Sequence, residues 1–167
     1  KEFFKYEQTW IKFVNESQAY GAIYSYVPKE GITTAMNKAC IDVSFTSIEQ
    51  MPIPETPEQI HEYQQMLIYA LSKIPTIDYI DDRNTKMYGD RDIFENIPNE
   101  FISEEVVRQA IEKNRIYLTY ANPMNENFSE LIDIAFKNKL ASMGRTELTP
   151  KEHELMQKFA LNNADFF

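Results

Sequence analysis

Glycine is scarce in this sequence of 167 residues: the four glycines are Gly21, Gly31, Gly89 and Gly144, and each stands alone. Loops that cradle phosphate groups need several glycines at close spacing. The sequence therefore has neither a dinucleotide-binding fingerprint nor a P-loop. It also lacks the G-x-S-x-G pattern that places the nucleophile of many hydrolases.

Cysteine and histidine are equally scarce, with Cys40, His61 and His153 as the full set. A single cysteine excludes an intramolecular disulfide. We therefore expect a reducing, cytoplasmic compartment, with a disulfide-free secreted protein as the alternative. Cys40 begins an apolar alternation and is predicted to be a buried structural thiol. Gln65 stands where a zinc-protease motif beginning at His61 needs its second histidine, so that motif is absent.

Long apolar runs are also missing, and no stretch approaches the roughly 20 residues that a membrane-spanning helix needs. The first residues, Lys1–Phe4, do not form a secretory signal, because charges interrupt them. With 43% hydrophobic residues, the chain can still bury a sizeable core. We expect one domain spanning residues 1–167, with no membrane association.

The clearest helix signal lies between Pro52 and Pro75. Thr56 and Gln59 have the spacing of a capping box, and Pro57 stands where its missing N–H costs nothing. Apolar residues then recur at helical spacing: Ile60, Tyr63, Leu67, Ala70 or Leu71, and Ile74. The pattern predicts an amphipathic helix over about residues 56–74, whose apolar stripe must lie on another surface.

Other segments carry weaker signals. Helices are predicted over about residues 3–18, 103–113, 127–143 and 149–162, and strands over 19–27, 39–48, 76–80, 86–94 and 115–121. Strands before helices predict an α+β fold, with a mostly antiparallel sheet covered by the 56–74 helix and followed by C-terminal helices. We find no internal repeat beyond the Thr-Pro start shared by Thr56 and Thr149.

The net charge of −9 is unevenly distributed. Residues 42–82 contain one lysine and eight acidic residues, so the acidity gathers around the predicted 56–74 helix and the segment after it. Such a surface repels the phosphates of nucleic acid and attracts basic proteins. Nucleic acid is therefore an unfavourable ligand, and a basic protein is the expected partner.

The leading interpretation is a non-enzymatic protein-binding module of inhibitor, immunity or anti-defence type, without a cofactor. Tyr69 is expected on the solvent side of the 56–74 helix, where an aromatic ring among acids suits a basic protein. The residues predicted to bind the partner are Glu58, Glu62, Tyr69, Asp78, Asp81, Asp82, Asp90 and Asp92.

Two alternatives remain open. Asp78, Asp81, Asp82, Asp90 and Asp92 could hold a divalent cation in a metal-dependent enzyme, and Asp42, Glu62 and Asp78 could form a carboxylate triad. The same aspartates could also lie in a solvent-exposed turn and have no functional role. A structural subunit, including a homo-oligomer, is the other alternative, because the chain begins without Met and ends in Phe166-Phe167.

Overall fold

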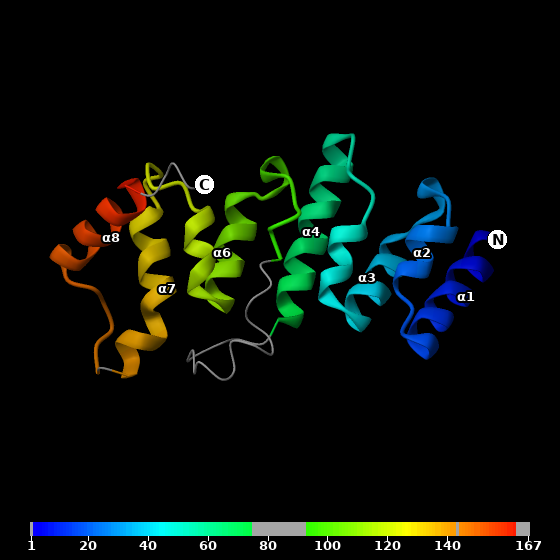
Figure 1. Cartoon of the computed structure of the whole chain (residues 1–167), viewed down its shortest axis with the longest axis horizontal. Coiled ribbons are helices and arrows are strands. Elements are labelled where there is room, and N and C mark those ends of the chain that lie inside the picture. Colours follow the sequence, from blue (N-terminus) through cyan, green and yellow to red (C-terminus); the bar gives the residue numbers. More distant parts are fainter. Residues whose placement is uncertain (1, 75–92, 143, 163–167) are drawn as a thin grey trace. The chain divides into compact units, whose positions relative to one another are not determined.

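The computed structural model describes residues 2–74, 93–142 and 144–162 (Figure 1). These residues form helices joined by turns, and the described ranges contain no strand. The α-helices are α1 (Glu2–Ser17), α2 (Gly21–Tyr26), α3 (Thr34–Val43), α4 (Pro57–Lys73), α6 (Glu104–Lys113), α7 (Phe128–Ser142) and α8 (Pro150–Asn162). Short 3₁₀ helices lie between them: η1 (Lys29–Gly31), η2 (Phe45–Gln50), η3 (Asn99–Phe101) and η4 (Arg115–Tyr120).

The prediction of an α+β fold with an antiparallel sheet is wrong, because the described residues are helical. The strand expected over 19–27 contains α2, the one over 39–48 contains the second half of α3 and most of η2, and the one over 115–121 contains η4. The strand over 76–80 lies outside the described residues, as does most of 86–94. A short run of β-branched and aromatic residues fits a buried helical turn as well as a strand, and tertiary packing decides between them.

The longer helices were predicted correctly. Thr56 accepts a hydrogen bond from the Gln59 amide, and the Gln59 side chain accepts one from the Thr56 amide, which completes the capping box of α4. Ile74 then has extended backbone, as expected before a proline. Ser103 caps α6 in the same manner through the amide of Val106.

The start of α8 and the end of α7 also follow the sequence signals. Thr149 and Glu152 exchange backbone and side-chain hydrogen bonds, so the Thr-Pro start shared with α4 is confirmed. After α7, Gly144 has φ of +70° and donates to the Ala141 carbonyl, while Arg145 donates to the Leu140 carbonyl. This pair of bonds is a Schellman motif, which needs the left-handed conformation that glycine adopts easily.

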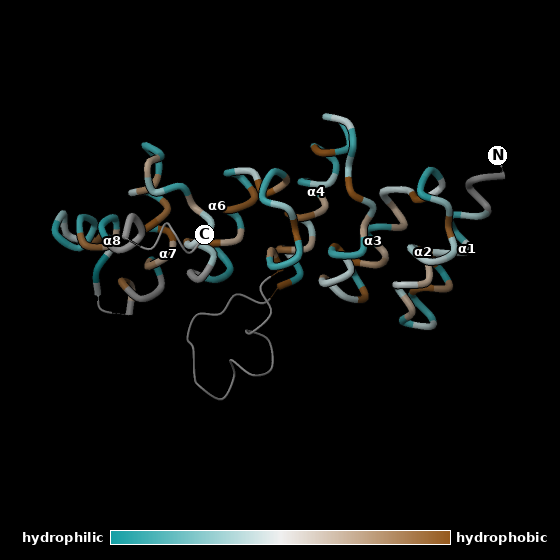
Figure 2. The backbone as a smooth tube through the Cα atoms, turned by 45° about the horizontal axis from the view of Figure 1, so that its top comes forward, coloured by the Kyte–Doolittle hydropathy of each residue, from teal (hydrophilic) through white to brown (hydrophobic). Residues whose placement is uncertain are grey.

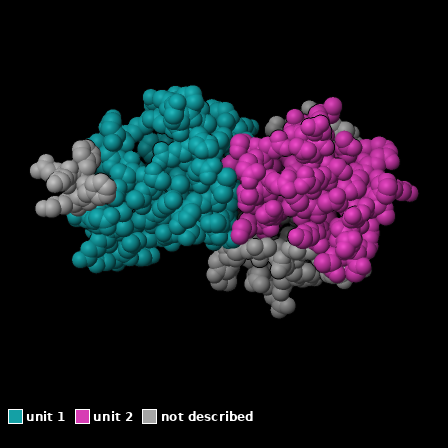
Figure 3. Space-filling view, turned by 180° about the vertical axis from the view of Figure 1, so that it is seen from behind, with its two compact units in different colours: residues 1–74, 91–102 teal, residues 75–90, 103–167 magenta. Residues whose placement is uncertain are grey.

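The chain divides into two compact units: unit 1 comprises residues 1–74 and 91–102, and unit 2 comprises 75–90 and 103–167 (Figure 3). In unit 1, α3 packs against both α1 and α4. One part of its core is a cluster of Val14, Ile23, Val27, Met36 and Cys40. The expectation of one domain stays a prediction, because compact units can belong to one domain or to two.

Unit 2 is built from α6, η4, α7 and α8, with α7 in contact with each of the other three. Its core contains buried residues from α6 and α7, including Val106, Ile111, Leu131 and Ile132. Figure 2 shows brown hydrophobic and teal hydrophilic stretches alternating within the helices, as amphipathic helices require. None of the helices in the described ranges is long and apolar enough to cross a membrane.

The structure also reveals an internal repeat, which corrects the expectation of none. Residues 23–51, called the first copy, match residues 93–121, the second copy, at a constant offset of 70 positions. Both copies run from a proline through a 3₁₀ helix, a capped ten-residue α-helix and a six-residue 3₁₀ helix. Identical residues include the pairs Ile23 and Ile93, Pro28 and Pro98, Glu30 and Glu100, Ile32 and Ile102, and Ile41 and Ile111.

The two copies also share their local backbone hydrogen bonds. The amide of residue 31 donates to the carbonyl of Pro28 across 2.8 Å, and the amide of residue 101 donates to Pro98 across 3.0 Å. Ser44 donates to Cys40 and Asn114 to Ala110, both across 2.9 Å. Equal geometry at positions with different side chains shows that the repeat is one of local fold, with the sequence retained mainly at the turns.

Candidate functional site

The residues predicted to bind a partner fall into two groups. Glu58 and Glu62 are exposed on α4, as expected for its solvent side. Among the described residues neither carboxylate forms an ion pair, so both charges are available to a partner. The other predicted acids, Asp78, Asp81, Asp82, Asp90 and Asp92, lie outside the described residues. Their role stays a prediction.

Tyr69 is half-buried and lies in a mixed-charge setting. Its hydroxyl donates a hydrogen bond to Asp42 Oδ1 across 2.8 Å, and Lys73 Nζ lies 2.5 Å from the same oxygen. The ammonium groups of Lys73 and Lys38 lie 4.5 and 5.4 Å from the centre of the Tyr69 ring. Burial alone would raise the pKa of Asp42, but the hydrogen bonds from Lys73 and Tyr69 outweigh it and lower that pKa. Tyr69 therefore joins α3 to α4 and is not a ring surrounded only by acids.

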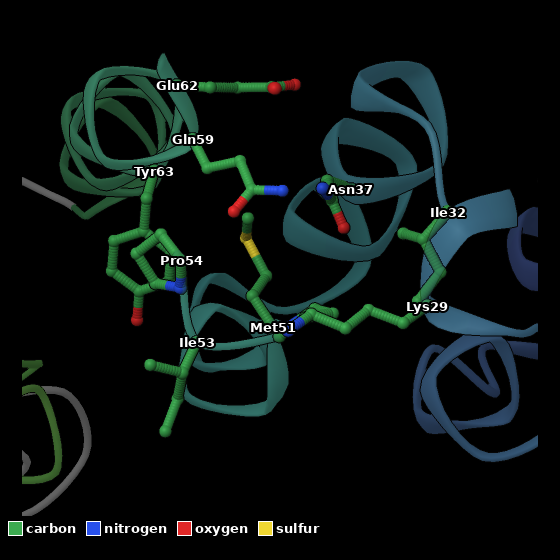
Figure 4. Close-up of a pocket in the computed structure, with 10 residues that line it drawn as sticks. Lys29, Ile32, Asn37, Met51, Ile53, Pro54, Gln59, Glu62 and Tyr63 are labelled. Atoms are coloured by element: carbon green, nitrogen blue, oxygen red, sulfur yellow. The ribbon is translucent and has the colours of Figure 1, made fainter. Parts of the chain in front are cut away.

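A small pocket lies in unit 1 beside Glu62, between α3, α4 and the Met51–Pro54 segment (Figure 4). We call it the Asn37 pocket. Its volume is about 120 Å³, and its walls combine apolar and polar side chains. The residues used below are Lys29, Asn37, Met51, Gln59, Glu62 and Tyr63.

Asn37 is the buried polar residue of this pocket, with 7% of its surface exposed. Its Oδ1 accepts a hydrogen bond from the hydroxyl of Tyr24 across 3.2 Å, which fixes the orientation of the carboxamide. The Nδ2 group is then directed toward the pocket and the side chain of Gln59 (Figure 4). Among the described residues no acceptor pairs with it, and the nitrogen is not fully shielded from solvent, so a donor that water can reach faces the hollow.

Gln59 presents a second carboxamide to the same space. Its Oε1 accepts hydrogen bonds from the amides of Glu55 and Thr56, at 2.8 and 3.2 Å, as part of the α4 capping box. The cap thus holds the oxygen, and the Nε2 group is directed toward Asn37 (Figure 4). Two N–H donors converge on one pocket because a helix cap and a buried tyrosine each hold the neighbouring oxygen.

Charged groups surround the opening of the pocket. The Glu62 carboxylate accepts a hydrogen bond from the hydroxyl of Thr34, which connects α4 to the start of α3. Lys29 Nζ lies 2.6 Å from Glu55 Oε1, so the charge of this lysine is balanced locally. Glu62 therefore supplies the unbalanced charge at the pocket, and this charge is negative.

Cys40 and Tyr24 are further polar side chains near Asn37 in the core of unit 1. Cys40 is fully buried, with its sulfur 3.5 Å from the Tyr20 carbonyl, and this confirms the predicted structural thiol. Burial raises the pKa of Cys40 to about 11. Burial and the neighbouring Cys40 also raise the pKa of Tyr24. These groups are therefore neutral near pH 7, which suits a network of hydrogen bonds inside a core.

The second copy provides an internal comparison for this polar cluster. Phe94 occupies the position of Tyr24, and Val107 occupies the position of Asn37. Both are buried, with 2% and 5% of their surface exposed. The repeated fold therefore accepts apolar residues at both positions, and the hydroxyl and the carboxamide were not needed to form it.

A second polar constellation lies in unit 2. Ser129 Oγ is 3.1 Å from His153 Nδ1, and Asp133 Oδ1 is 3.2 Å from His153 Nε2. Ser129 and Asp133 are one turn apart on α7, with one near each imidazole nitrogen, and Asp133 Oδ1 makes no hydrogen bond among the described residues. The residue types match a nucleophilic triad, but acyl transfer also needs a substrate cavity and oxyanion donors. We interpret these contacts as a polar attachment of α8 to α7.

An apolar hollow of about 370 Å³ lies between α1 and α2, lined by Thr9, Trp10, Phe13, Ala22 and Tyr26. Trp10 and Phe13 meet edge to face, with ring centres 5.9 Å apart. Phe13 and Tyr26 are 44% and 73% exposed. This aromatic surface was not identified from the sequence, which assigned residues 19–27 to a strand.

The carboxylate triad expected from Asp42, Glu62 and Asp78 is not assembled by the described residues. Asp42 pairs with Lys73, Glu62 pairs with Thr34, and Asp78 lies outside the described ranges. The described ranges contain no cluster of three or more histidine, cysteine or acidic residues that could hold a metal ion. No protein-family model matches this sequence, and comparisons with curated proteins and with solved structures also give no match.

Proposed function

We propose that this chain is a non-enzymatic protein-binding module that engages a basic partner through the α4 side of unit 1. The supporting observation is that Glu58 and Glu62 are exposed on α4 without a balancing cation among the described residues, and that Glu62 borders the Asn37 pocket. Unpaired carboxylates beside a small pocket suit recognition of a cationic side chain. An inhibitor, immunity protein or anti-defence protein would use such a surface.

The repeat adds a second argument for protein binding. Proteins made of helical repeats present exposed helix faces and loops whose residues can vary while the packing of the repeat is kept. The first copy contains the Tyr24–Asn37 pair that the second copy lacks. Most positions differ between the copies, and the polar pair that orients Asn37 toward the pocket is among these differences.

Charge reversal tests the proposal. The protein and its Glu58→Lys/Glu62→Lys variant would be immobilised and exposed to lysate of the source organism at low and high salt, with retained proteins identified by mass spectrometry. Glu112→Lys/Glu126→Lys is the matched control, because it makes the same charge change on exposed residues of unit 2. We expect basic proteins that the wild type and the control retain at low salt and that the α4 variant loses. Equal retention by all three proteins would refute the proposal.

The alternatives also stay predictions. A metal-dependent enzyme would use the aspartates of residues 78–92, and calorimetry with Mg²⁺, Mn²⁺ and Ca²⁺ tests this directly. A structural subunit or homo-oligomer would use an apolar surface such as the hollow between α1 and α2. A mass that depends on protein concentration would support that alternative.

A further inference from the structure

The size of the Asn37 pocket limits what it can bind. Its volume of about 120 Å³ is well below the roughly 300–1,000 Å³ of sites for drug-sized ligands and cofactors. One side chain or one peptide unit fits such a space.

The chemistry of the walls favours a peptide unit. The N–H groups of Asn37 and Gln59 face one another across the pocket, and both lack an acceptor among the described residues. Two converging donors match the two lone pairs of a carbonyl oxygen. The apolar surfaces of Met51 and Tyr63 complete the pocket and suit the carbon atoms beside that carbonyl.

The charged residues at the opening of the Asn37 pocket indicate which side chain of the ligand lies beside the bound carbonyl. Glu62 carries the unbalanced negative charge there, while Lys29 is balanced by Glu55. A carboxylate next to a pair of N–H donors favours a segment in which a cationic side chain lies beside the bound carbonyl. Lysine and arginine both satisfy this requirement.

The second copy argues that the donors serve a ligand and not the fold. Val107 replaces Asn37 in an equally capped ten-residue helix, and Phe94 replaces the tyrosine that orients Asn37. The Asn37 nitrogen is not fully shielded from solvent and Gln59 is exposed, so water can satisfy both donors in the free protein, and a ligand carbonyl would replace that water. A donor pair in one copy only is expected where a ligand supplies the acceptor.

We infer that the Asn37 pocket binds an extended basic segment of a partner protein, with Asn37 and Gln59 donating hydrogen bonds to one backbone carbonyl and Glu62 binding the adjacent lysine or arginine side chain. This inference rests on the proposed function and names its recognition subsite.

The test is a titration of the full ¹⁵N-labelled chain with acetyl-Ala-Arg-Ala-N-methylamide, followed by NMR. The probe contains a backbone carbonyl beside an arginine, and acetyl-Ala-Glu-Ala-N-methylamide is its charge-inverted control. We expect saturable shifts of the Asn37 and Gln59 side-chain NH₂ signals with the arginine peptide and weaker binding of the glutamate peptide.

Variants separate the subsite from general charge attraction. Tyr24→Phe/Asn37→Val installs the residues of the second copy and removes one donor. Gln59→Leu removes the other donor without adding charge, and Gln65→Leu makes the same change on the exposed side of α4 as its control. We expect about tenfold weaker binding by each pocket variant, as for loss of one well-placed hydrogen bond, and no change with Gln65→Leu.

Two contrary outcomes are distinguishable. Arginine-peptide shifts that spread over exposed acids and are unchanged in Tyr24→Phe/Asn37→Val would overturn the subsite and leave the proposed function in place. Equal or absent responses to the two peptides would overturn the subsite and also count against a basic partner. Retained ¹H–¹⁵N spectra confirm that each variant is folded.

Discussion

The Tyr24 hydroxyl and the Asn37 carboxamide are joined by a hydrogen bond of 3.2 Å that connects α2 to α3 inside unit 1. The equivalent residues of the second copy, Phe94 and Val107, are apolar and buried. The hydroxyl and the carboxamide thus occur together in one copy and are absent together from the other. Replacing both partners of such a pair by apolar groups of similar shape can be nearly neutral for stability, so the local fold does not require the pair.

The first prediction concerns this pair. We expect Asn37→Val and Tyr24→Phe each to lower the free energy of unfolding by about 1 kcal/mol, because each leaves one buried polar group without its partner. The double variant should be close to wild type, since it restores an apolar pair. Denaturant unfolding of the four proteins measures the coupling, and strictly additive effects would contradict the prediction.

The capping boxes give the second prediction. Thr56→Ala removes the oxygen that accepts from the Gln59 amide and should lower stability by about 1 kcal/mol. Thr56→Ser keeps that oxygen and is the matched control, with an expected change near zero. Thermal melts followed by circular dichroism compare the variants. Equal melting temperatures for Ala and Ser would show that the cap does not stabilise α4.

Gly144 gives the third prediction. At φ of +70° an alanine is strained although nothing lies within 4 Å of its added Cβ, so Gly144→Ala should lower stability by about 1 kcal/mol. Gly31→Ala is the control, because Gly31 has no such φ and its added Cβ meets Val27 at an ordinary 3.4 Å. Denaturant unfolding should show a loss for the first variant and little change for the second.

Alkaline pH provides the fourth prediction. Burial raises the pKa of Cys40 to about 11 and that of Tyr63 to about 12. Both groups are neutral in the fold and ionise more easily in the unfolded chain, at ordinary values near 8.5 and 10. Their contribution to stability is therefore complete below about pH 8.5 and is lost as the pH rises through the folded values.

Cys40→Ala tests this dependence, because Ala110 occupies the same position in the second copy. Unfolding free energies at pH 8 and pH 10.5 should fall less steeply in the variant than in the wild type. An unchanged slope would show that the thiol does not contribute. Alkylation with iodoacetamide at pH 8 should also be slow until denaturant is added, since Cys40 is fully buried.

The fifth prediction concerns Asp42. Its pKa is lowered by hydrogen bonds from Lys73 and Tyr69, against the effect of burial. Tyr69→Phe removes one of these bonds and should move the Asp42 pKa upward, and Lys73→Met should move it further. NMR titration of the Asp42 carboxyl measures both. The wild-type contribution is present above the ordinary pKa and is lost as the pH falls, so the variants, in which this contribution is smaller, should lose less stability than the wild type on acidification.

Much of the fold could be predicted where the sequence contains a long periodic stripe with a cap. Thr56, Ser103 and Thr149 each precede such a stripe, and the helices begin within one residue of the expected positions. The predictions of the short elements were wrong for a physical reason. Helices α2 and η4 have six residues each, which are too few to show a helical period in the sequence. Packing against neighbouring helices determines their conformation.

The candidate site was predicted only in part. Glu58 and Glu62 follow from charge and helical phase, but Asn37 lies just before the strand predicted over 39–48 and was given no role. The signal that could have found it is the repeat, which aligns Asn37 with Val107 and Tyr24 with Phe94. That repeat was missed because identity is confined to a few positions such as Pro28, Glu30 and Ile32.

The two copies have matching backbone hydrogen bonds, so one segment could be exchanged for the other. Transplanting residues 93–121 onto 23–51 would keep the turns and caps in register and would exchange the whole polar cluster in one step. The reverse graft would install a tyrosine, an asparagine and a cysteine where the chain now has Phe94, Val107 and Ala110. Such grafts would test whether the polar residues can be exchanged between the copies while the backbone hydrogen bonds are kept.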